Sequence, residues 1–194
     1  ADGDNDPSNT DNNGLLVNGF VQSLPVTLTA EGEPTGEGGT QTPDDNNTNN
    51  TVDFGLAGYS LGNRVWSDPN NNGLIDGTET GISGVTVRLY ASNGTTEINV
   101  GPDGILGTAD DATGGVTTNA SGYYRFDNLP AGDYIVRVTN PAGLTSSTVN
   151  AGDPDLDVDD SDDNGTVLAA GTTSSAVVTL GTGNVDPTLE PDLG

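Results

Sequence analysis

The stretch YYRFDNLPAGDYIVRVT, residues 123–139, decides the fold class. Within residues 123–129 the alternation places Tyr124 and Phe126 on one face, and residues 133–139 alternate in the same way. The apolar face of that second run consists of Tyr134, Val136 and Val138. The letters NLPAGD between the two runs are typical turn formers. The stretch therefore predicts two short β-strands separated by a turn.

Three further runs extend this pattern to both sides. Residues 85–90 (VTVRLY) alternate, residues 174–180 (SSAVVTL) are rich in β-branched side chains, and residues 62–66 (GNRVW) precede both. The apolar face of residues 85–90 consists of Val85, Val87 and Leu89. Because no stretch has a sustained helical period, the chain is predicted to be all-β, an antiparallel sandwich with Trp66 in its core.

A different pattern lies between two of these strands, in WSDPNNNGLIDGTETGI at residues 66–82. Alternating oxygen-bearing side chains, a central glycine and a glutamate six residues later are the ligand spacing of a calcium loop. The predicted ligands are Asp68, Asn70, Asn72, the Leu74 carbonyl, Asp76 and a bidentate Glu79, with Gly73 at the bend. Ile75 and Ile82 are expected to anchor the loop to the core. The alternative is a metal-free turn, since Asn and Asp favour turns in any case.

Composition restricts the chemistry. The 194 residues carry 29 Asp and Glu against 4 Lys and Arg, a net charge of −25, which repels nucleic acid and anionic membranes. Cys, His and Met are absent, so disulfides and zinc or haem sites are excluded, and any metal must be a hard cation bound by oxygen. No run is apolar enough for membrane insertion. No signal peptide is visible, as in a secreted chain after cleavage or a window of a longer one.

The chain contains an internal repeat with an offset of 151 residues. Residues 1–14 (ADGDNDPSNTDNNG) align with residues 152–165 (GDPDLDVDDSDDNG), and LPVTLT at 24–29 resembles AVVTLG at 176–181. We therefore expect residues 1–57 to be the C-terminal part of a preceding repeat, or a strand-donating segment, and residues 58–194 to be nearly one full repeat.

Three acidic segments besides the loop are candidate calcium sites, with solvated linkers as the alternative. Their carboxylates would repel one another strongly without a counter-ion. The candidate ligands are Asp155, Asp157, Asp160, Asp162 and Asn164 in residues 153–165; Asp103, Asp110 and Asp111 in residues 101–115; and Asp2, Asp4, Asp6, Asp11 and Asn13 near the N-terminus. The sequence thus predicts several Ca²⁺ sites.

The order of these motifs resembles the B-type repeat of serine–aspartate-repeat bacterial surface adhesins, a relative of prealbumin-like collagen-adhesin B modules. The resemblance rests on residues 61–90, on residues 117–144, and on the acidic stretch followed by VVTLG. It implies a seven-strand Greek-key sandwich (prealbumin/Ig-like), repeated in tandem as an extracellular stalk that calcium stiffens. Its calcium motif falls on the same residues of the 68–79 loop.

Two departures from that family pattern matter. Many collagen-adhesin B modules carry a Lys–Asn isopeptide bond, which a chain without lysine cannot form. The family's DADG turn is NASG at residues 119–122, which removes two carboxylates and with them the expectation of a metal there. Residues 101–115 (GPDGILGTADDATGG) are an insertion.

Residues 1–57 are predicted to be half a sandwich, with strands near 15–21, 24–30 and 51–56. Half a sandwich leaves strand edges open and needs a partner. The expected partner is a neighbouring copy, either in a tandem array or in subunits that polymerise by donated strands. Both arrangements are linear and open. The alternative is a disordered acidic tail.

The predicted function is therefore structural: an extracellular calcium-binding repeat of a stalk, adhesin shaft or filament. An enzyme is not expected, because histidine bases are absent and no carboxylate lies isolated in apolar sequence. The alternative is an adhesin domain that recognises a host protein or glycan. It would need an exposed aromatic or arginine cluster, and the chain has few aromatic residues, mostly on core-facing strands.

Overall fold

The computed structural model describes residues 14–17, 20–31, 52, 54–150, 162–169 and 171–181. The chain divides into two compact units, Ala1–Ala57 and Gly58–Gly194. Within the described residues every regular element is a β-strand, and every pair of strands is antiparallel.

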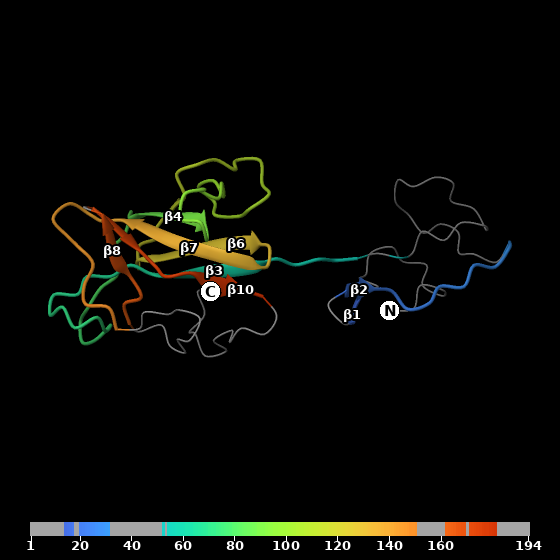
Figure 1. Ribbon diagram of the computed structural model, residues 1–194, viewed down its shortest axis with the longest axis horizontal. Helices are drawn as coiled ribbons and strands as arrows, with labels where there is room; N and C mark the ends of the chain where they lie inside the picture. The colour runs from blue at the N-terminus through green and yellow to red at the C-terminus, as the bar shows by residue number, and fades with distance from the viewer. Residues whose placement is uncertain are drawn as a thin grey trace. The chain divides into compact units, whose positions relative to one another are not determined.

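The larger sheet of the second unit has six strands in the order β5-β4-β7-β9-β8, with β10 also paired to β7. Figure 1 labels β4, β7, β8 and β10 of this sheet. Its strands are β4 (Thr86–Ala91), β5 (Val116–Thr117), β7 (Gly132–Thr139), β8 (Thr166–Ala169), β9 (Thr172–Ser174) and β10 (Val178–Leu180). The longest strand, β7, is central because it pairs with β4 along one side and with β9 and β10 along the other.

The smaller sheet pairs β3 (Tyr59–Arg64) with β6 (Tyr123–Leu129). The predicted runs 123–129 and 133–139 are thus both strands, and they belong to different sheets. The chain changes sheet between them at Pro130, whose carbonyl accepts a 2.8 Å hydrogen bond from the Tyr134 hydroxyl. Asn128, at the end of β6, has a left-handed φ of 60°, a conformation that Asn tolerates well.

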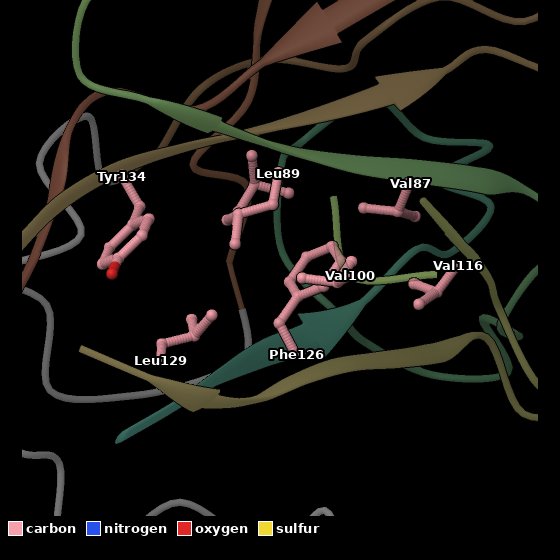
Figure 2. Packing of buried hydrophobic residues seen from close by; sticks show 8 residues of the cluster. Val87, Leu89, Val100, Val116, Phe126, Leu129 and Tyr134 are labelled. Carbon is pink, nitrogen blue, oxygen red and sulfur yellow. The ribbon is translucent and has the colours of Figure 1, made fainter. Parts of the chain in front are cut away.

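The core lies between the two sheets, which makes the unit an all-β antiparallel sandwich as predicted. Figure 2 shows Val87 and Leu89 reaching from β4 toward Phe126 and Leu129 of β6. All four of these side chains are fully buried. The other members of the cluster are Val100, Val116, Tyr134 and Val136. Alternation along β4 and β7 therefore identified the buried residues Val87, Leu89, Tyr134 and Val136, and along β6 it identified Phe126 but not Leu129.

The predicted strand 174–180 is interrupted in the structure. Arg137 faces Ser174 and Tyr134 faces Val178, so β7 advances three residues while the opposing chain advances four. This is a one-residue bulge. Ser175 fills it, since its backbone N–H donates to the Val136 carbonyl and its hydroxyl accepts from the Val136 N–H at 3.0 Å.

Three side-chain expectations were wrong. Trp66 is only half-buried, outside the core cluster, and pairs with Gly81 in an isolated β-bridge beyond the end of β3. Ile75 and Ile82 are likewise half-buried and do not belong to the core cluster. The backbone holds the segment instead, because the Ile82 N–H donates to the Val65 carbonyl at 2.8 Å.

In the first unit, β1 (Leu15–Val17) and β2 (Phe20–Gln22) form an antiparallel hairpin. The single strand predicted near 15–21 is therefore two strands, separated by Asn18 and Gly19, a dipeptide that favours hairpin turns. The strands predicted near 24–30 and 51–56 are not formed among the described residues there. Pro25 lacks the N–H that a strand ladder needs, which accounts for part of the first error.

Candidate metal centre

The two ends of the loop 68–79 are joined by a short β-type ladder of backbone contacts, which we call the neck, and not by helices. Trp66 bridges Gly81, and the Ser67 N–H donates to the Thr80 carbonyl at 3.0 Å. The Ile82 N–H closes the same neck on the Val65 carbonyl. The neck fixes both ends of the loop between strands β3 and β4. A loop with this ligand spacing therefore fits between two strands of a sandwich.

Asp68 organises the first half of the loop. Its Oδ1 accepts a 2.6 Å hydrogen bond from the Asn71 N–H, and its Oδ2 accepts one of 2.8 Å from the Gly73 N–H. Asn71 and Gly73 have left-handed φ values of 56° and 73°. A side chain at Gly73 would also place its Cβ 2.0 Å from the Thr148 carbonyl oxygen. Gly73 is thus required by conformation and by space.

The amides and carboxylates of the second half converge on Asp76. The side-chain N–H groups of Asn70 and Asn72 both donate to Oδ2 of Asp76, at 3.4 and 2.9 Å. The Oδ1 atoms of the same two residues accept from the N–H groups of Asn72 and Leu74, at 3.0 and 2.9 Å. Asn70 and Asn72, two of the predicted ligands, therefore lie close to a third, the carboxylate of Asp76.

Glu79 is the residue whose contacts are incomplete. Its Oε2 accepts a 3.3 Å hydrogen bond from the Asp76 N–H, but its Oε1 is buried and has no hydrogen-bond partner. A buried carboxylate oxygen without a donor is costly. A cation is one partner that would satisfy it, so this observation fits a bidentate glutamate. Among the residues that the structure describes, no three acidic side chains form a metal-binding cluster by themselves. Amide and carbonyl oxygens would have to complete any site.

Two remote segments clamp the loop. The Thr148 N–H donates to Asn71 Oδ1 and the Thr148 hydroxyl to the Asn71 carbonyl, each at 3.1 Å. From the other segment, the Asp163 N–H donates to the Gly73 carbonyl at 2.8 Å, and Asp162 bridges Leu74. The end of the acidic segment 153–165 is therefore part of the framework of the loop.

Asp68 and Asp163 have opposite pKa shifts. Partial burial raises the pKa of Asp68, but the hydrogen bonds from Gly73, Asn71 and Ser147 together lower the pKa by more than burial raises it. The pKa of Asp68 therefore lies below 3.8. Burial raises the pKa of Asp163 above 3.8, against the hydrogen bonds from Gly165, Ser147 and Ser146, and the negative charge of Asp68 raises it too. Negative charge is therefore concentrated where the clamp meets the loop.

The insert 101–115 gathers oxygens around Thr108. Its single hydroxyl lies 2.6 Å from Asp110 Oδ1, 3.2 Å from Asp103 Oδ2, 3.4 Å from Asp111 Oδ1 and 3.2 Å from the Ile105 carbonyl. One hydroxyl has one proton, so it cannot satisfy four acceptors. The hydrogen bond from Thr108 is the main cause that lowers the pKa of Asp110.

The other predicted ligands divide into two groups. Asp162 and Asn164 lie beside the loop, where Asn164 Nδ2 is 3.5 Å from Asp162 Oδ1. Asp155, Asp157, Asp160, Asp2, Asp4, Asp6, Asp11 and Asn13 lie outside the described residues. Sequence reasoning missed the supporting roles of Asn71, Ser147 and Thr148. No periodicity connects residues 146–148 with residue 71, so only the fold reveals them.

A cleft of about 280 Å³ opens next to the loop. Trp66, Tyr124, Val138 and Leu144 provide apolar walls, and Asp68 and Asp163 lie at its polar side. The indole Nε1 of Trp66 is buried without a hydrogen-bond partner. The half-buried tryptophan thus borders this cleft instead of the core.

Residues 59–193 match the protein family described as SdrD B-like domain. The chain is 45% identical over 107 residues to serine-aspartate repeat-containing protein I of Staphylococcus saprophyticus, which covers 53% of this chain and 5% of that protein. It is 41% identical over 108 residues to a fibrinogen-binding protein of Staphylococcus epidermidis, which covers 54% of this chain and 8% of that protein. It is 44% identical over 94 residues to serine-aspartate repeat-containing protein D of Staphylococcus aureus strain Newman, which covers 48% of this chain and 6% of that protein. The chain therefore spans less than a tenth of these relatives.

Among solved structures, the minor pilin GBS52 of Streptococcus agalactiae is similar at a TM-score of 0.35 and 20% identity, over 62% of this chain and 39% of the pilin. No helix in the described part of the chain is long and apolar enough to span a membrane. The matched relatives are surface adhesins and structural proteins, not enzymes. The family match confirms the resemblance inferred from the motifs: the chain belongs to the SdrD B-like domain family, as a structural repeat of bacterial cell-surface proteins.

Proposed function

We propose that this repeat binds Ca²⁺ in the loop 68–79 and serves as a calcium-stiffened unit of an extracellular stalk, adhesin shaft or filament. The observation that carries the proposal is Glu79 Oε1, a buried carboxylate oxygen without a partner at the predicted bidentate position. Asp68, Asn70, Asn72, Leu74, Asp76 and Glu79 would hold the ion.

A bound Ca²⁺ would supply positive charge and an oxygen-coordinating centre to this strongly acidic region. The protein residues supply the framework. Asp68 fixes the first turn through two backbone N–H groups, and Gly73 allows the close approach of the Thr148 carbonyl. The clamp from Asp163 then ties the loop to the six-stranded sheet through the adjacent β8. Rigidity at the loop would therefore be transmitted to the sandwich.

A second site is proposed in the insert, at Asp103, Asp110 and Asp111. Its support is the excess of acceptors over donors around Thr108. The insert is itself anchored on β6, since the Leu106 N–H donates to the Asp127 carbonyl and the Asp127 N–H donates to the Gly104 carbonyl. The segment 153–165 and residues 2–13 remain proposed sites on the basis of their sequence alone.

Linear assembly with shared strands is the second part of the proposal. Its support is the apolar surface of the first unit, where Phe20 is 74% and Leu28 is 70% exposed. A two-stranded hairpin is marginally stable alone and gains stability from added strands. Neighbouring copies, in tandem or as separate subunits, are the proposed partners.

Thermal unfolding with and without EDTA tests the calcium proposal. A ligand that binds only the folded state at a hundredfold excess over its Kd adds about 2.7 kcal/mol per site to the free energy of unfolding. The melting temperature should therefore fall on chelation and recover with added CaCl₂ but not with NaCl of equal ionic strength. An unchanged melting temperature would contradict calcium binding. Analytical ultracentrifugation of the same samples tests assembly separately.

A second candidate function, recognition of a host protein or glycan, is favoured by the cleft beside Trp66. An aromatic wall next to carboxylates is a common arrangement in ligand pockets. A glycan array and a pull-down with host matrix proteins, each repeated with Trp66→Ala, would test it. Retention that disappears in the variant would support an adhesin domain.

A further inference from the structure

Strand β8 (Thr166–Ala169) is an edge strand that no other strand of the described residues covers. It is the outermost strand of the six-stranded sheet, and all four of its residues are exposed. Val167 is 56% and Leu168 is 52% exposed, and successive strand residues point to opposite faces. Proteins usually protect such an edge with a charge, a proline or a covering segment. In β8 there is neither a charged residue nor a proline.

Two segments of the chain lack charged residues, so they can contact each other without repulsion between carboxylates. In a chain of net charge −25, the two longest stretches without a charged residue are 12–30 and 164–185. One contains the hairpin β1–β2, and the other contains β8, β9 and β10. Contact between acidic surfaces of two copies would bring carboxylates together, and like charges in contact cost free energy. Contact between these two segments avoids that cost.

The hairpin exposes the apolar side chains that an edge strand would cover. In β1, Leu15 and Val17 are 42% and 38% exposed, and in β2, Phe20 and Val21 are 74% and 43% exposed. The two strands pair only with each other in the described part of the first unit. The hairpin therefore presents both an apolar surface and a free strand edge.

The hairpin also corresponds in sequence position to β8–β9. At the repeat offset of 151, Leu15 corresponds to Thr166 and Gln22 to Thr173. Both pairs of strands are antiparallel and short. In the second unit, β9 adds to β7 and so completes a sheet, whereas the described β1–β2 hairpin has no further strand. A hairpin of this kind is suited to addition at the margin of a sheet.

We propose that the β1–β2 hairpin of one copy adds to the free edge of β8 in a second copy and extends its six-stranded sheet by main-chain hydrogen bonds. This inference rests on the end-to-end assembly proposed above and names its contact surface. The hairpin and the β8 edge are different surfaces of one copy, so the contact is heterologous and generates an open chain of subunits.

Two charge variants of the full chain test the contact. Phe20→Asp places a carboxylate in the hairpin, with Leu56→Asp as control because Leu56 is 78% exposed. Leu168→Asp places one on the β8 edge, with Thr95→Asp as control because Thr95 is exposed and lies outside the cleft and both proposed calcium sites. A buried unpaired charge is strongly unfavourable. Each test variant should raise the protein concentration needed for assembly by about tenfold or more, with the controls near wild type.

Mixing the two test variants separates contact between copies from contact within one chain. Sedimentation velocity in CaCl₂ should show each variant alone as a monomer. The equimolar mixture should form a complex of two copies, because one variant retains its edge and the other its hairpin. If the mixture stays monomeric, the hairpin does not bind a second copy at β8.

Hydrogen exchange on the wild-type assembly provides a readout that does not depend on the variants. Amides of residues 15–17, 20–22 and 166–169 should become protected on assembly while those of β5, at the opposite edge, keep their rates. If wild type assembles and these amides stay unprotected, the contact surface is wrong but linear assembly stands. If wild type does not assemble at any calcium concentration, the proposed assembly and this inference both fail.

Discussion

The backbone N–H of Asp163 donates a 2.8 Å hydrogen bond to the carbonyl of Gly73. This bond joins the end of the acidic segment to the bend of the loop 68–79. It brings the carboxyl of Asp163 close enough to Asp68 for the charge of Asp68 to raise its pKa. The loop and its clamp are therefore one electrostatic unit, and changes in either should alter both.

Glu79→Gln should weaken calcium binding at the loop more than Asp110→Asn does. The substitution removes a charge and one of two oxygens from a buried position, whereas Asp110 is exposed. Isothermal titration calorimetry should show at least about a tenfold loss of affinity for the glutamate variant, a change of 1.4 kcal/mol. Asp133→Asn, on β7 outside both proposed sites, is the charge-matched control. The reverse order of effects would contradict our ranking of the sites.

Gly73→Ala should be far more damaging than Gly77→Ala. Both glycines have left-handed φ values, 73° and 55°, so both variants incur a conformational cost of about 1 kcal/mol. At Gly73 the new Cβ would also meet the Thr148 carbonyl oxygen at 2.0 Å, whereas nothing lies within 4 Å at Gly77. Urea unfolding without calcium should therefore separate the two variants. Equal destabilisation would show that the loop does not dock on residue 148.

Acid titration of stability should reveal opposite contributions from Asp68 and Asp163. The folded-state pKa of Asp163 is raised, so ionisation of this group lowers stability as the pH rises above the unfolded value of 3.8. The pKa of Asp68 is lowered, so its stabilising contribution is present above 3.8 and is lost as the pH falls below it.

The variant Asp163→Asn should accordingly gain stability relative to wild type between acidic and neutral pH in EDTA. Asp68→Asn should lose stability in the same range. Urea denaturation at a series of pH values measures both. A wild-type-like pH profile for Asp163→Asn would mean that burial of this carboxyl has no energetic effect.

Phe126→Ala should destabilise the second unit by about 3–5 kcal/mol, because it leaves a cavity between the sheets. Phe126 is completely buried and faces Val87 and Leu89 of β4 (Figure 2). Ile105→Ala is a suitable comparison, since Ile105 is 38% exposed on the insert. Circular dichroism melts of both variants check this. A small effect at Phe126 would contradict the placement of the core.

The core could be predicted from sequence because its strands alternate on one face. β4 and β7 carry buried residues at every second position, and the predicted ranges of β4, β6 and β7 agree with the structure within a residue or two. In β6 the buried residues Phe126 and Leu129 are three positions apart, so alternation identified Phe126 but not Leu129. β8 was not predicted, because all four of its residues are exposed and no alternation marks it. LPVTLT at 24–29 alternates yet forms no strand, since alternation favours a strand only where a partner strand is available.

The loop was predictable in its spacing but not in its support. The positions of Asp68, Gly73 and Glu79 follow from a short local pattern. The contacts of Asn71 with Thr148 and of Gly73 with Asp163 join residues that are distant in the chain. Such contacts depend on which strands lie side by side in the fold, and the spacing of hydrophobic residues along the sequence does not specify how strands pair.

The long separation between the loop and its clamp has a consequence for biogenesis. Asn71 and Thr148 are 77 residues apart, and Asp163 lies farther on. During synthesis and export the loop emerges well before the segments that hold it, and contacts over such distances form late in folding. The loop would thus be completed only after the segments that contain Thr148 and Asp163, near the end of the repeat, have been synthesised. Completion of the loop would then mark the completion of the repeat.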